Sequence, residues 1–182
     1  FSVLAMVSAG LRYTYDTSWD GQGYHQSAII ALSNGWNPVY QPLINFKQHL
    51  PSQIFAEGYP SALWEIQSSI YSLTGWINTA KVMNLAIAII AAQFLYILSR
   101  KLNISKFLSV LLSLLVVIQP VFLIQFLTFM QDGFGYQLLV IAITSLIIII
   151  LDLKAHWAVM SFLMSIILLV STKYSHLPIA LI

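Results

Sequence analysis

Cysteine is absent from this 182-residue chain, and charged residues are scarce. Without cysteine the chain can form no disulfide framework, no thiolate metal site and no cysteine nucleophile. Asp, Glu, Lys and Arg make up 8% of the residues, whereas soluble domains carry about 25%. Eight basic residues against six acidic ones give a net charge of +2, which indicates no surface for nucleic acid. The histidines are scattered singly, so no metal-ligand spacing is present.

Hydrophobic residues make up 59% of the chain, and their long runs predict an all-α polytopic transmembrane protein with about five spans. Because the chain begins with Phe1 and ends inside an apolar run, we expect residues 1–182 to be the N-terminal part of a single transmembrane domain whose C-terminal remainder is absent. The predicted spans are the end of one at residues 1–11, then 79–99, 105–130 interrupted at Pro120, 133–151 and 157–171.

Residues 12–78 form a long and much more polar segment between the first two predicted spans. Apolar residues at helical spacing predict one amphipathic helix over 21–34, which Gly35 ends, and a second from Pro60 to Gly75. Both are too short or too polar to span a bilayer, and tryptophan and tyrosine are frequent around them. Such helices are typical of the membrane–water interface.

The positive charges of the short connections predict the orientation of the chain. Arg100, Lys101 and Lys106 cluster in one connection and Lys154 lies in another, and the positive-inside rule places both in the cytoplasm. The long first loop and the segment around 120–132 then lie outside. We expect an integral protein of a bacterial or archaeal plasma membrane, with its functional site on the outer face.

Three aspartates on the predicted outer face are candidate catalytic residues. Asp20 lies in YDTSWDGQGYH, where glycines allow a substrate to approach the backbone closely, and Asp16 precedes it by one turn. Asp132 lies between two apolar runs, where an ionisable side chain is costly and needs a partner or a function. The pentapeptides at 20–24 and 132–136 share the pattern D-G-x-G-Y. Asp20 and Asp132 also suit helix N-caps, which is the structural alternative for each.

Four further residues are candidate substrate contacts. Lys173, in VSTKYSHLP, can place a compact positive charge on a phosphate, or it can extend its ammonium from lipid to the headgroups. His176 lies beside it, and Tyr24 and His25 follow Asp20 by about one turn. Each histidine can instead satisfy a local hydrogen bond.

The order of these elements resembles the N-terminal half of the GT-C superfamily of glycosyltransferases. A first span is followed by a long outer loop with an early aspartate, and then by YPSALWEIQSSIYSLTG leading into the second span. TFMQDGFGYQ and STKYS then follow at later outer positions. The superfamily includes the protein O-mannosyltransferases and the lipid A aminoarabinose transferases.

The resemblance implies transfer of a sugar from a polyprenyl-phosphate-linked donor at the outer membrane face. An acidic residue of the first outer loop would act as the base, which here is Asp20 with Asp16 as the alternative. Asp132 matches a second acidic position, and Lys173 is the best match for a basic residue at the donor phosphate. Family members often have two adjacent acids in the first loop, whereas Asp16 and Asp20 are separated. The membrane lipid and the donor are the expected partners, and the acceptor, any cofactor and any need for a divalent metal are left open.

Three other functions compete with this interpretation. A transporter could use the outer aspartates and Lys173 to bind an ion or solute, although such sites usually lie near the bilayer midplane. In a membrane scaffold without enzymatic activity, helix capping alone would explain the aspartates. A lipid-linked oligosaccharide polymerase or ligase often relies on outer-loop arginines, and Arg12 is the residue of this type that the predicted outer loop offers.

Overall fold

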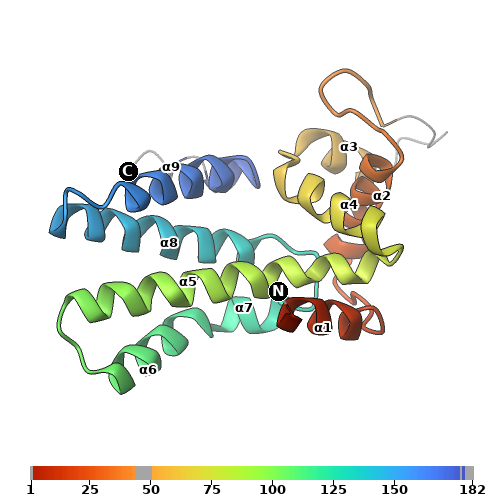
Figure 1. Ribbon diagram of the computed structural model, residues 1–182. Helices are drawn as coiled ribbons and strands as arrows, with labels where there is room; N and C mark the ends of the chain where they lie inside the picture. The colour runs from red at the N-terminus through yellow and green to blue at the C-terminus, as the bar shows by residue number, and fades with distance from the viewer. Residues whose placement is uncertain (1, 44–50, 177, 179–182) are drawn as a thin grey trace.

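The structure is a computed structural model that describes residues 2–43, 51–176 and 178, and these residues form helices and no strand (Figure 1). The expectation of an all-α protein is confirmed. In chain order the elements are α1 (Ser2–Leu11), the π turn η1 (Gly21–His25), α2 (Gln26–Ser33), α3 (Pro51–Gly58), α4 (Ala62–Thr74), the 3₁₀ turn η2 (Ile77–Lys81), α5 (Val82–Lys101), α6 (Lys106–Val117), α7 (Pro120–Gln125), α8 (Asp132–Leu151), α9 (His156–Val170) and the 3₁₀ turn η3 (Tyr174–His176).

Two helical segments are long and apolar enough to cross a membrane. They are Ile77–Lys101, which joins η2 to α5, and Asp132–Leu151, with mean hydropathies of 2.0 and 2.5. Three further apolar helices, α1, α6 and α9, have 10, 12 and 15 residues. Length and composition therefore support two membrane-crossing helices among the described residues.

The long helices form a bundle with α8 at its centre (Figure 1). Because α8 is apolar around its whole circumference, it can pack against α5 on one side and α9 on the other. The helix α6 packs against α5. The connections after α5 and α8 meet at one end of the bundle, where Lys101 Nζ lies 2.7 Å from Asp152 Oδ2. The helices α2, α3 and α4 gather at the opposite end (Figure 1).

A break at Pro120 divides the third predicted span into α6 and α7. Proline has no N–H and clashes with the carbonyl one turn earlier, so the carbonyls at the end of α6 lose their helical partners. Two side chains of α8 replace them: the Tyr136 hydroxyl donates to Val116 O at 3.0 Å, and Gln137 Nε2 donates to Val117 O at 2.9 Å. Side chains of α8 thus supply the hydrogen-bond donors that the carbonyls at the end of α6 lack.

The chain between α7 and α8 is held from the side by Asn84 of α5. The Asn84 amide group is buried, and its Nδ2 lies 3.3 Å from Gln125 O, 3.3 Å from Phe126 O and 3.0 Å from Thr128 O. These carbonyls lie at or just after the end of α7, where no continuing helix supplies N–H donors to them. Asn84 therefore fixes the path of the segment that leads to Asp132.

The long segment between α1 and α5 is anchored at its beginning by a buried lysine. Lys81 is fully buried, and its Nζ donates to Thr14 O at 2.7 Å and to Thr14 Oγ1 at 3.0 Å. The ammonium also lies 5.7 Å from the centre of the Phe129 ring. Lys81 thus ties the segment after α1 to the start of the long helix and to the segment after α7.

The two predicted amphipathic helices are present, and both end where glycine was expected to end them. Gly35 has φ +88° after α2, and Gly75 has φ +71° after α4. Left-handed backbone of this kind carries no steric penalty for glycine. Together with α3, the turns η1 and η2 and the segment after α7, these helices enclose an apolar core, formed by Tyr24, Ala28, Ile29, Leu43, Ala56, Trp64, Ala80 and Phe129.

The prediction that Asp20 caps the helix over 21–34 is wrong. Asp20 is already helical, with φ −63° and ψ −41°, and its side chain makes no capping hydrogen bond. The cap is Ser18, whose Oγ accepts from the Gly21 N–H at 3.1 Å, and Asp16 Oδ1 accepts in turn from the Ser18 N–H and hydroxyl at 2.7 and 2.6 Å. Asp20 is therefore free of a capping role.

Replacement of Asn84 by alanine should lower the free energy of unfolding by about 1–3 kcal/mol, because buried carbonyls lose a donor. Ser145→Ala is the matched control, since the fully buried Ser145 hydroxyl of α8 has no hydrogen-bond partner among the described residues. That variant should change stability by no more than about 0.5 kcal/mol. Unfolding in mixed micelles of increasing SDS content measures both, and equal stability of the two variants would contradict the role given to Asn84.

Candidate functional site

Five of the predicted site residues line one small cleft at the end of the bundle where α2 and α4 lie. They are Asp20, Tyr24, His25, Asp132 and Lys173, and Tyr59, Met130 and Gln131 complete the lining. The enclosed volume is about 10 Å³, which is close to the room that one water needs. A larger ligand would therefore sit at the mouth of the cleft and contact these side chains from outside.

The π turn η1 brings Asp20, Tyr24 and His25 to this cleft. Its hydrogen bond runs from the Gln26 N–H to Gly21 O, one residue farther than in an α-helix. Single π turns inside α-helices are frequent at functional sites, since the extra residue redirects the side chains around it. The turn starts directly after Asp20 and ends at His25.

Gly21 lets this turn pack against Asp16. A Cβ at Gly21 would overlap the Asp16 carboxylate and would approach Ser18 Oγ to 2.5 Å. Asp16 is 3% exposed, and its Oδ2 accepts from the Phe129 N–H at 2.6 Å. Both oxygens of Asp16 are thus engaged by the backbone and by Ser18. Asp16 does not line the cleft, and in this structure it joins the first loop to the segment before α8.

Tyr24 lies between an acidic and a second phenolic side chain. The Tyr24 hydroxyl is close to the Asp20 carboxylate and to Tyr59, and burial together with these neighbours raises its pKa well above the usual range. Tyr24 is 4% exposed, so it remains a neutral hydroxyl near neutral pH. As such it can donate a hydrogen bond to Asp20 and orient that carboxylate.

Asp132 and Lys173 form an ion pair at the edge of the cleft. Lys173 Nζ lies 2.5 Å from Asp132 Oδ1, and the two side chains are 27% and 39% exposed. Gln125 Nε2 donates to Asp132 Oδ2 at 3.2 Å. The alternative of Asp132 as an N-cap is wrong, because Asp132 is the first residue of α8 and Gln125 Oε1 accepts from the Gly133 N–H at 2.6 Å. The Asp132 carboxylate is thereby available to Lys173.

His25 is 2% exposed, and its ring is fixed by Trp64. The Trp64 Nε1–H donates to His25 Nδ1 at 2.8 Å. Burial, together with the nearby Lys173 ammonium, lowers the pKa of His25 to about 3, and Asp132 acts in the opposite direction. His25 is therefore a neutral imidazole at the wall of the cleft.

His176 lies against α8 and does not line the cleft. Its Nδ1 is 3.2 Å from Leu169 O and 3.4 Å from Thr172 Oγ1. A Cβ at Gly135 would overlap the His176 ring, so glycine allows the close packing of α8 on this imidazole. Burial lowers the pKa of His176. In the structure His176 thus makes local hydrogen bonds, which was the alternative to a substrate contact.

The sequence analysis did not identify Tyr59, Gln131 and Trp64. In the amide orientation that satisfies its neighbours, Gln131 donates to Thr172 O at 2.5 Å and accepts from Trp64 Nε1 at 2.9 Å. Its position directly before Asp132 in the sequence could have identified Gln131 as a residue of the cleft. Trp64 carried no comparable signal, because its contact with His25 joins residues 39 positions apart.

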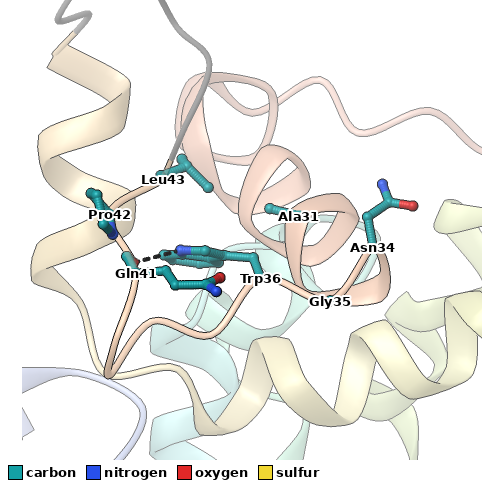
Figure 2. Close-up of a pocket in the computed structure, with 7 residues that line it drawn as sticks. All are labelled: Ala31, Asn34, Gly35, Trp36, Gln41, Pro42 and Leu43. Carbon is teal, nitrogen blue, oxygen red and sulfur yellow. Dashed lines mark hydrogen bonds between the residues drawn. The ribbon is translucent and has the colours of Figure 1, made fainter.

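A larger hollow lies beside Trp36, away from the predicted site residues. Figure 2 shows its lining of Ala31, Asn34, Gly35, Trp36, Gln41, Pro42 and Leu43, and its volume is about 390 Å³. The Trp36 Nε1–H donates to Gln41 O at 2.9 Å, which closes the loop at one side. None of these seven residues is ionisable, so this hollow lacks the groups that acid–base chemistry needs. Because it gathers five of the predicted site residues, the small cleft is the candidate site.

In the described part of the chain, no three His, Asp or Glu side chains gather in a way that could hold a metal ion. Asp20 and Asp132 supply the carboxylates of the cleft, and Lys173 already pairs with Asp132. No protein-family model, no curated protein and no solved structure matches this chain. The chemistry of the cleft therefore carries the functional argument.

Asp16→Asn should destabilise the protein by about 1–3 kcal/mol, because an amide cannot accept from all of the donors that the carboxylate now satisfies. Asp20→Asn, at a half-buried position without a capping bond, should shift stability by no more than about 0.5 kcal/mol. Thermal unfolding in detergent, followed by circular dichroism, compares the two. A larger loss in Asp20→Asn than in Asp16→Asn would reverse the roles given to these residues.

Proposed function

We propose that this chain carries the donor-binding active site of a membrane glycosyltransferase, which moves a sugar from a polyprenyl-phosphate-linked donor to an acceptor at the outer membrane face. The observation that supports it most is the convergence of Asp20, Asp132 and Lys173 on one cleft from segments far apart in the chain. Two carboxylates and one ammonium at the end of an apolar bundle match what the transfer needs: a proton acceptor, a positioned cation and access from lipid.

The exposed surface of the bundle supports a membrane location. Large apolar side chains of α6 and α9 are exposed, among them Phe107, Leu115, Met160 and Ile167. A contiguous apolar surface of this kind is unfavourable in water and favourable in lipid. In the proposed arrangement α1, the α6–α7 pair and α9 complete five crossings with the two long helical segments, and residues 12–78 form the outer loop.

The distribution of basic residues supports the proposed orientation. Arg100, Lys101 and Lys106 lie near the α5–α6 connection, and the Lys101–Asp152 ion pair brings this connection to the α8–α9 connection. The cleft lies at the opposite end of the bundle, where α8 begins and α9 ends. If the basic end faces the cytoplasm of a bacterial or archaeal cell, the cleft faces outward.

In the proposed reaction, an acceptor hydroxyl or amine attacks the anomeric carbon of the donor. The bond between that carbon and the phosphate oxygen breaks, and the lipid phosphate leaves with the electron pair. Asp20 takes the proton of the acceptor, which makes its oxygen or nitrogen a better nucleophile. Lys173 stabilises the charge that develops on the leaving phosphate. Asp132 positions the Lys173 ammonium, and Tyr24 orients Asp20.

A transporter is the second candidate function, since the same cleft could bind a solute or ion. Transporter sites usually lie near the bilayer midplane on interrupted helices. The interrupted helix of this bundle is the α6–α7 pair, and its freed carbonyls are occupied by Tyr136 and Gln137. The charged cleft lies instead at a helix end, which favours an interfacial enzyme.

Asp20→Asn should lower the rate of sugar transfer about 10²–10⁴-fold, the range typical for loss of a general base. Asp152→Asn is the matched control, since Asp152 is an exposed aspartate at the opposite end of the bundle and should leave transfer unchanged. The assay uses the protein in native-like membranes with a mixture of radiolabelled polyprenyl-phosphate sugars, and it measures release or transfer of label.

The outcomes of this assay separate the alternatives. Undiminished transfer in Asp20→Asn, with loss of transfer in Asp132→Asn, would move the base to Asp132. Absence of turnover of every polyprenyl donor by the wild type would contradict the glycosyltransferase proposal. Solute uptake into proteoliposomes, lost in Asp20→Asn and retained in Asp152→Asn, would then support the transporter.

Lys173→Met should lower kcat/KM for the lipid-phosphate donor roughly 10–100-fold, because a hydrogen bond to a charged group is worth about 1.5–3 kcal/mol. Lys101→Met breaks an ion pair of similar length and exposure at the other end of α8 and should leave kcat/KM unchanged. Initial rates at varied donor concentration measure both variants. Equal losses in the two would show a general effect of charge rather than contact with the donor.

A further inference from the structure

We infer that His25 is held as the tautomer with hydrogen on Nε2, and that it presents this N–H to a phosphoryl oxygen bound beside Lys173. The inference rests on the proposed function and deepens it, because it gives the donor phosphate a second, uncharged hydrogen-bond donor. It also removes His25 from the possible proton acceptors of the cleft. The argument depends on the contact between His25 and Trp64.

The tautomer follows from the chemistry of that contact. An indole N–H can donate a hydrogen bond and cannot accept one. The Trp64 Nε1 atom lies 2.8 Å from His25 Nδ1, so Nδ1 must offer its lone pair there. A neutral imidazole carries one hydrogen on nitrogen, and with Nδ1 unprotonated this hydrogen is on Nε2.

The second imidazole nitrogen is not engaged elsewhere in the described part of the chain. His25 is hydrogen-bonded through Nδ1, which accepts from the Trp64 Nε1–H at 2.8 Å. His25 nevertheless lines the cleft, and its Nε2 is absent from the buried polar atoms that lack a partner. His25 Nε2 thus has no protein acceptor among the described residues and is not sealed from its surroundings, and the residue that carries it lines the cleft, so its N–H is available to a ligand there.

The surroundings of His25 keep it uncharged. Asp20, Tyr24, Tyr59, Asp132 and Lys173 line the cleft together with His25. The Lys173 ammonium disfavours a second positive charge, and Asp132, which would favour one, already pairs with Lys173 at 2.5 Å. Trp64 donates to Nδ1, so protonation of that nitrogen would place two N–H groups against each other.

An uncharged donor beside a cation suits a phosphoryl group. Phosphate oxygens accept several hydrogen bonds, and an N–H to a charged oxygen is stronger than one between neutral groups. A proton acceptor would need a lone pair facing the cleft, and His25 has none there. The cleft is thus divided into acceptors, Asp20 and Asp132, and donors, Lys173 and His25.

The test uses the protein in nanodiscs with ¹⁵N-labelled histidine, observed by solid-state NMR between pH 5 and pH 8. We expect a His25 signal with unprotonated Nδ1 and protonated Nε2 across this range. Addition of a polyprenyl phosphate without sugar should shift the Nε2 signal, whereas the matching polyprenol should not. His156, which begins α9 at the opposite end of the bundle, is the internal control and should not respond.

Variants separate hydrogen-bond donation from packing. His25→Gln retains an N–H donor at a similar reach and should keep polyprenyl-phosphate affinity within about threefold, whereas His25→Phe keeps the ring and should weaken it about tenfold or more. Trp64→Phe removes the indole N–H and should allow the other tautomer to appear. Equal affinity of His25→Phe and wild type, or a protonated Nδ1 in the wild type, would overturn the inference.

Inorganic phosphate separates this inference from the proposed function. A shift of Nε2 by inorganic phosphate, with none by polyprenyl phosphate, would retain the phosphoryl site and contradict the lipid-linked donor. Binding of polyprenyl phosphate with an unchanged His25 signal would retain the donor and overturn the inference. Absence of a response to both ligands would contradict both.

Discussion

The interruption of the helix at Pro120 is the constraint that organises the rest of the structure. Inside an apolar bundle, every backbone N–H and C=O that a broken helix releases must find a partner within the protein. Tyr136 and Gln137 supply donors to the end of α6, and Asn84 supplies one to the end of α7. Because these partners come from α5 and α8, the break also determines how the neighbouring helices are placed. The hydrogen bonds from Asn84 also fix the position of the segment that leads to Asp132 in the cleft.

The two ends of α8 carry ion pairs of similar geometry, and the comparison separates structure from function. Lys101–Asp152 and Lys173–Asp132 are both partly exposed, with N–O distances of 2.7 and 2.5 Å. Exposed pairs contribute about 0–1 kcal/mol to stability, so neither pair is needed to hold the bundle together. The pair at the cleft differs in its neighbours, since Asp20, His25 and Gln131 line the same space. This neighbourhood, rather than the pair itself, supports a chemical role.

Local patterns in the sequence predicted the apolar helices, α2 and α4 with their glycine ends, and the placement of Asp20, Asp132 and Lys173 on one face, but not α3. The predicted alternation of spans put these three residues on one face, and periodicity is a local property that can be read directly. The cap at Ser18 and the π turn were not predictable in this way. Both depend on Asp16, whose carboxylate is held by Phe129 more than a hundred residues later. The fixed ring of His25 depends in the same manner on Trp64.

The direction in which the Asp20 side chain points depends on the number of residues in the π turn η1. An α-helix turns by about 100° per residue, and η1 holds one residue more than a regular turn would. Deletion of Gly23 would restore a regular helix without removing any side chain of the apolar core or of the cleft. Everything before the deletion would then rotate relative to α2, and the Asp20 carboxylate would leave the cleft. Sequences that share every residue of the cleft but differ by one residue in this turn would therefore fold alike and lack the same site.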